Sequence, residues 1–75
     1  MKKYRLVREA YDGAQTTVSQ SDNIHYLNKR METAWMKELQ EAKAKDRNIQ
    51  RSFFVDDSAR ITGVALWMIL ENTQE

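Results

Sequence analysis

The chain contains no cysteine and only one histidine, His25. Without thiols it can form neither disulfides nor thiolate metal sites, and a single imidazole cannot build a multi-histidine zinc site. We therefore expect no metal and no cofactor. A chain of 75 residues buries only roughly 60–65% of the surface that its unfolded form exposes, so an isolated core is marginal. Small folds compensate with disulfides, a metal or oligomerisation. Of these three sources of additional stability, oligomerisation is the one that remains.

Long apolar runs and an excess of charge of one sign are also lacking. The longest apolar run, 64–70, is about a third of the ~20 residues that span a bilayer. The basic N-terminus is not followed by the apolar core of a signal peptide. A net charge of +1 provides no global attraction to nucleic acid or membrane. We expect one domain over residues 1–75, located in the cytoplasm and not in a membrane.

A long amphipathic helix is the clearest feature that is present. Apolar residues recur at spacings of three and four, which is one stripe of an α-helix; they are Ile24, Leu27, Met31, Ala34, Trp35, Leu39 and Ala42. Neither proline nor glycine interrupts the segment. Ser21 is the expected N-cap, with Ser19 and Asp22 as alternatives. Basic residues gather near 43–47, where cations suit the helix dipole. The pattern predicts a helix over about 22–46.

The segment before the helix predicts a hairpin. Residues 3–11 alternate so that Tyr4 and Leu6 face the core while Arg5, Val7 and Glu9 face outward. Asp12 and Gly13 then suggest a two-residue type I′ turn, in which both central residues need positive φ. The mostly polar, β-prone residues 14–19 are expected to return as a strand at the edge of the sheet.

Two further strands are predicted after the helix, over about 50–56 and 61–70. The polar residues 57–60 would connect them, and Gly63 would mark a bulge or a close approach of two backbones. A short helix over 63–71 is the alternative, because periodicity cannot separate helix from strand where every position is apolar. The predicted fold is α+β: a two-layer ββαββ domain with a mostly antiparallel four-stranded sheet and one long helix on one face.

The last predicted strand is apolar on both faces, whereas one helix covers only one face of a sheet. Leaving large apolar side chains in water would create an exposed patch of the kind that marks an interaction site. We expect a symmetric homodimer joined through the sheets or their edges, with a different protein partner or a monomer as alternatives. The residues expected at this interface are Phe54, Ile61, Trp67 and Ile69.

Nucleic-acid binding is the alternative function. Two basic clusters could combine if the fold brought them together; they are Lys2, Lys3, Arg5 and Arg8, and Lys43, Lys45, Arg47 and Arg51. Tyr4, Tyr11 and Phe54 could then stack on bases if they were exposed. The charges of the helix itself are balanced, which is typical of a solvated helix.

No motif in the sequence carries a chemical reaction. His25 has no nucleophile or carboxylate spaced to work with it, so a surface role is expected. Asp56 and Asp57 could bind a cation, but such a pair in a turn usually serves the turn itself. The Met31, Trp35 and Leu39 stripe could accept a partner helix, although such stripes usually contact their own core. We expect a non-enzymatic binding protein, of the accessory kind that compact bacterial or phage genomes encode, with an enzyme built across a dimer interface as a third class.

Overall fold

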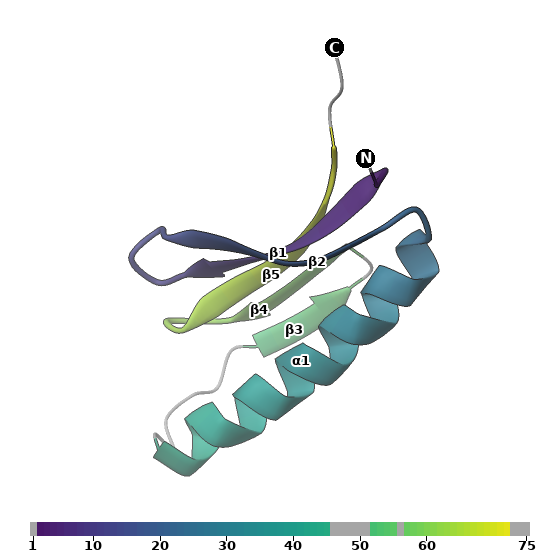
Figure 1. Cartoon of the computed structure of the whole chain (residues 1–75). Helices are drawn as coiled ribbons and strands as arrows, with labels where there is room; N and C mark the ends of the chain where they lie inside the picture. Colours follow the sequence, from purple (N-terminus) through teal and green to yellow (C-terminus); the bar gives the residue numbers. More distant parts are fainter. Residues whose placement is uncertain (1, 46–51, 56, 73–75) are drawn as a thin grey trace.

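The fold is a five-stranded antiparallel sheet with one helix against one of its faces, as the computed structural model of the chain shows (Figure 1). The structure describes residues 2–45, 52–55 and 57–72. The elements in chain order are β1 (Tyr4–Ala10), β2 (Gln15–Ser21), α1 (Ile24–Lys45), β3 (Ser52–Val55), β4 (Ser58–Ile61) and β5 (Ala65–Glu71). The strand order across the sheet is β2-β1-β5-β4-β3. The predicted α+β class is confirmed, whereas the four-stranded ββαββ order is wrong.

The additional strand arises because the chain turns at Gly63, between the end of β4 at Ile61 and the start of β5 at Ala65. The amide of Val64 donates to the carbonyl of Ile61 at 2.9 Å, and Gly63 has a φ of 81°. A positive φ at the third position of a turn is what a type II turn requires, and glycine adopts it without strain. The predicted strand 61–70 is therefore a hairpin of β4 and β5, and the predicted connection 57–60 lies mainly within β4. The alternative helix over 63–71 is wrong.

The predicted hairpin of β1 and β2 is confirmed, but its turn has another geometry. Of Asp12 and Gly13, only Gly13 has positive φ, at 93°, so the turn is not of type I′. The amide of Gly13 donates to the carbonyl of Ala10, and the Asp12 carboxylate accepts from the amide of Ala14. This is the three-residue loop in which a left-handed glycine follows a tight turn. Farther along, Val18 is an extra residue on β2 and forms a bulge opposite β1.

Helix α1 begins at Ile24, two residues later than the sequence suggested. The Asn23 side-chain oxygen accepts from the amides of His25 at 3.0 Å and Tyr26 at 3.3 Å, so Asn23 and not Ser21 is the N-cap. The Ser21 hydroxyl oxygen instead accepts from the amide of Asn23 at 3.0 Å. Two amides of the first turn are thereby satisfied, as helix termini require.

The core lies between α1 and the sheet. Leu27 and Met31 are fully buried on the helix and belong to the same hydrophobic cluster as Leu6 of β1. Side chains of β5 alternate between the two faces, so that Ala65, Trp67 and Ile69 are buried toward the helix. Burying each large side chain of this kind stabilises the fold by roughly 1.5–3 kcal/mol. The covered face of the sheet is therefore the principal source of stability.

Candidate interaction surface

The residues predicted for a partner interface face the helix of their own chain. Ile61, Trp67 and Ile69 are at most 9% exposed, and Phe54 is half-buried against the same core. Phe54 also contacts Trp35 of α1, with ring centroids 5.5 Å apart. The sequence-based prediction placed these residues on the face of the sheet away from the helix, whereas they lie on the face that the helix covers.

Polar contacts between α1 and the sheet show why the aromatic side chains point toward the helix. The indole N–H of Trp67 donates to Glu38 Oε1 at 2.8 Å, and the indole N–H of Trp35 donates to the carbonyl of Arg60 at 3.1 Å. Arg8 of β1 also donates to the Glu38 carboxylate, with Nη2 2.7 Å from Oε2. A buried indole N–H needs an acceptor, and the helix side of the sheet provides one.

The opposite face of the sheet, here called the outer face, can be assembled from the strand register. Residues directly opposite each other in an antiparallel sheet have side chains on the same side. The first row across the strands consists of Gln15, Glu9, Leu66, Arg60 and Phe53. The second row consists of Thr17, Val7, Met68, Ser58 and Val55. Leu70 and Arg5 continue this face toward the end of β5.

Apolar side chains are exposed on the outer face. Phe53 is 47% and Val55 52% exposed on β3, whereas Val7 on β1 is only 2% exposed. Leu66 and Met68 on β5 are half-buried. Among the described residues, the only helix lies on the other side of the sheet, so no element of that part covers this face (Figure 1). Such a surface can bury apolar area against another molecule. The sequence showed that the last strand is apolar on both faces but gave no sign of which face the helix covers.

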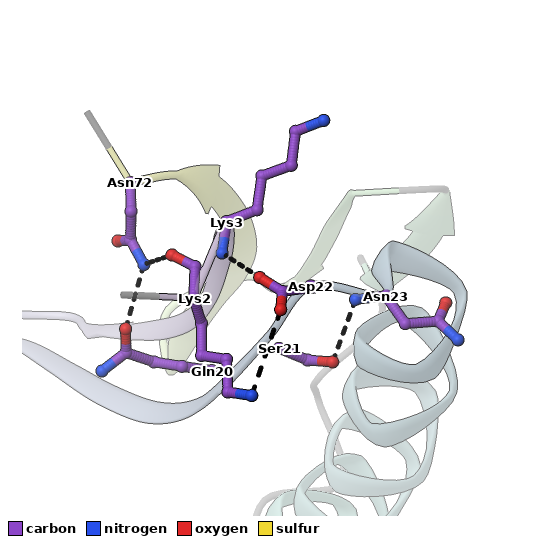
Figure 2. A network of polar contacts seen from close by, with 7 residues as sticks. All are labelled: Lys2, Lys3, Gln20, Ser21, Asp22, Asn23 and Asn72. Carbon is purple, nitrogen blue, oxygen red and sulfur yellow. Dashed lines mark hydrogen bonds and ion pairs between the residues drawn. The ribbon is translucent and has the colours of Figure 1, made fainter. Parts of the chain in front are cut away.

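A polar network joins the ends of β1, β2 and β5 (Figure 2). The Asn72 side-chain amide donates to the carbonyl of Lys2 at 2.6 Å and to Gln20 Oε1 at 2.9 Å, and its oxygen accepts from Arg5 Nη1 at 2.8 Å. The backbone of Lys3 donates to Asp22 Oδ1 at 2.8 Å. These contacts fix the strand ends beside the start of α1, which is a structural role.

The two predicted basic clusters do not converge. Lys2 lies 4.0 Å from Asp22 Oδ2, close to the start of α1, whereas Lys43 and Lys45 are in its last turn. A helix of 22 residues separates these positions by about 30 Å at 1.5 Å per residue. Within the first cluster, Arg5 and Arg8 already bind side chains of their own chain. The other predicted contacts, Arg47 and Arg51, lie outside the described residues. Of the aromatic residues expected to stack on bases, Tyr4 and Phe54 pack against the core and Tyr11 is 82% exposed.

The remaining candidate residues are Asp56, Asp57 and His25. Asp57 lies in the loop between β3 and β4 with a φ of 70°, and its amide donates to Asn28 Oδ1 of α1 at 2.9 Å. Asp56 lies outside the described residues. His25 is exposed in the first turn of α1. Across the described ranges, no three residues among His, Cys, Asp and Glu are grouped as metal ligands would be, and no helix combines the length and apolar composition needed to cross a bilayer.

Comparison of the chain with protein-family models, with curated protein sequences and with solved structures finds no match.

Proposed function

We propose that this chain is a small non-catalytic accessory protein that acts through protein–protein contacts and self-associates as a homodimer through the outer face of its sheet. The observation that carries the proposal is the group of apolar side chains in the two rows of that face: exposed Phe53 and Val55, and half-buried Leu66 and Met68. Covering such side chains removes apolar area from water and stabilises the associated state.

Support for a second copy as the partner comes from the size of the domain. A chain of 75 residues has a small core, and association of two copies adds buried area without any further sequence. The exposed side chains lie on neighbouring paired strands of the sheet. The face of a sheet presents side chains that can pack against the face of another sheet, with the two layers about 10 Å apart.

Sedimentation velocity over a range of micromolar concentrations tests this proposal. The unmodified chain should sediment as a dimer, and Met68→Glu should sediment as a monomer because its carboxylate would be desolvated at the centre of the contact. Gln40→Glu adds the same charge on the exposed side of α1 and should leave the dimer intact. A monomeric unmodified chain at these concentrations would refute the proposal.

Nucleic-acid binding stays a second candidate, supported by a surface other than the two clusters. Lys29, Arg30 and Lys37 lie on one flank of α1 beside Tyr26, which is 46% exposed. The Arg30 guanidinium lies 6.0 Å from the centre of the Tyr26 ring. An arginine next to an exposed aromatic ring suits phosphate and base contacts.

Mobility-shift titration with mixed DNA and RNA tests this second candidate. Phosphate contacts predict affinity that falls steeply with salt, with a slope that decreases by about one for each contact removed. The triple change of Lys29, Arg30 and Lys37 to Ala should abolish the shift. Lys43→Ala, in the last turn of the helix and outside this group, is the control and should retain it.

A further inference from the structure

Charged residues flank the centre of the outer face with opposite signs. In the first row, Leu66 of the central strand β5 lies between Glu9 of β1 and Arg60 of β4. Each is one strand away from Leu66, or about 4.8 Å in the hydrogen-bonding direction. The row is therefore negative on one side of β5 and positive on the other.

From this layout we infer that the homodimer has its two-fold axis along β5, so that Glu9 of each copy lies opposite Arg60 of the other. Rotation by 180° about an axis parallel to β5 exchanges the two sides of the sheet. The β1 strand of one copy then lies over β4 of the second copy, and Leu66 lies over its own equivalent. Two-fold symmetry produces the ion pair twice, once on each side of the axis. This arrangement rests on the proposed function, because it requires association through the outer face.

A two-fold axis that runs across the strands fits the charges less well. If this axis passes over Leu66, Glu9 of one copy lies over Glu9 of the other, and Arg60 over Arg60. Both pairs are like charges, which repel. Where it passes between the two rows, Glu9 lies over Val7, and a carboxylate is desolvated without a partner. Where it passes over Met68, Glu9 lies over Arg5, whose guanidinium already donates to Asn72 in its own chain at 2.8 Å.

Arg60 is available for an intermolecular contact. Its side chain is exposed, and its guanidinium lies 5.9 Å from the centre of the Phe53 ring in the same row. In the described part of the chain no carboxylate forms an ion pair with Arg60. Glu9 accepts a hydrogen bond from Gln15 Nε2 at 2.9 Å, which leaves the second carboxylate oxygen for the other copy. An arginine and a glutamate from facing sheets can together span the gap of about 10 Å between the layers.

Charge reversal with rescue tests the arrangement, with the dimer dissociation constant measured by sedimentation equilibrium. Glu9→Arg and Arg60→Glu should each weaken the dimer by about tenfold or more, because each places like charges opposite each other twice. The double variant Glu9→Arg with Arg60→Glu restores both pairs and should bind within about threefold of the unmodified chain.

Matched controls separate this effect from a change in net charge. Glu32→Lys and Lys29→Glu change the net charge by the same amounts on the exposed surface of α1 and should leave the dissociation constant unchanged. Gln15→Ala removes the hydrogen bond to Glu9 without changing any charge and should have a much smaller effect than Glu9→Arg. Thermal unfolding of each variant confirms that the protomer remains folded.

The outcomes distinguish the arrangement from the proposed function. If Met68→Glu splits the dimer but Glu9→Arg and Arg60→Glu behave like their controls, the outer face associates in another orientation and the axis along β5 is refuted. Rescue of Glu9→Arg by Arg5→Glu in place of Arg60→Glu would identify the axis across the strands. An unmodified chain that is monomeric at all concentrations would refute the proposed homodimer and this arrangement together.

Discussion

The indole N–H of Trp67 in β5 and the carboxylate of Glu38 in α1 form a hydrogen bond of 2.8 Å. The same carboxylate accepts hydrogen bonds from Nε and Nη2 of Arg8 of β1, and the Glu38 side chain is only 21% exposed. Polar groups withdrawn from water need partners, and here each of the three side chains satisfies another. The helix is thereby aligned with two neighbouring strands at a defined point along its length.

Replacing Glu38 with Ala should destabilise the fold. The change leaves the Trp67 N–H and the Arg8 guanidinium without their acceptor in a partly buried site, which costs about 1–3 kcal/mol. The free energy of unfolding in urea measures this loss. Glu32→Ala, at an exposed position of the same helix, should change it by less than about 0.5 kcal/mol. Equal effects of the two variants would contradict the structural role of Glu38.

Adjacent positions of β5 should respond oppositely to the same substitution. Trp67→Glu introduces a carboxylate into the core beside Glu38 and should unfold the protomer, since an uncompensated buried charge costs about 3–5 kcal/mol. Met68→Glu lies on the outer face and should retain a folded circular dichroism spectrum. If Trp67→Glu stays folded and only dissociates the dimer, Trp67 faces a partner and the observed alternation of β5 is wrong.

The left-handed backbone at Asp57 leads to a second stability prediction. Asp57 has a φ of 70°, where a side chain costs about 1–2 kcal/mol relative to glycine. Asp57→Gly and Asp57→Ala both remove the carboxylate that accepts from Asn28. The glycine variant should therefore be more stable than the alanine variant by about 1 kcal/mol after its larger chain entropy is included. Urea unfolding of the pair measures the difference, and a more stable alanine variant would contradict it.

Removing the Asn72 side chain should weaken the joined strand ends. Asn72→Ala deletes its hydrogen bonds with Arg5, Gln20 and the carbonyl of Lys2. These groups lie near solvent and can bond to water instead, so the expected loss is about 1–2 kcal/mol in urea unfolding. Gln20→Ala removes one of the same contacts and should cost less. A larger effect of Gln20→Ala would show that Asn72 is not the centre of the network.

Much of the fold could be predicted from the sequence, because a helix and a half-buried strand each require apolar residues at a regular spacing. The spacing of Leu27, Met31 and the other apolar residues of α1 predicted the helix, and the alternation around Leu6 predicted β1. The strand β4 was missed because it has only four residues. Only Ala59 and Ile61 among them are apolar, which is too few to show an alternating pattern. Gly63 was expected to mark a bulge or a close approach of two backbones within one strand, whereas it forms a turn between two strands.

The orientation of β5 could not be predicted because both of its faces are apolar. Placing Trp67 outward and placing it inward satisfy the same alternation, and only the three-dimensional position of Glu38 distinguishes them. Contacts of this kind join residues far apart in the chain, 29 positions in this case. The N-cap shows the same limit on a smaller scale, because Ser21 and Asn23 are both good capping residues.

The bulge at Val18 has a consequence for how far assembly can proceed. It interrupts the regular hydrogen-bonding positions of β2 at one border of the sheet, and β3 at the other border has only four residues. Short or irregular outermost strands hinder the lateral addition of further chains. Growth of the sheet into fibrils is thereby disfavoured, so the proposed pairing of two copies through the outer face would end at a particle of fixed size.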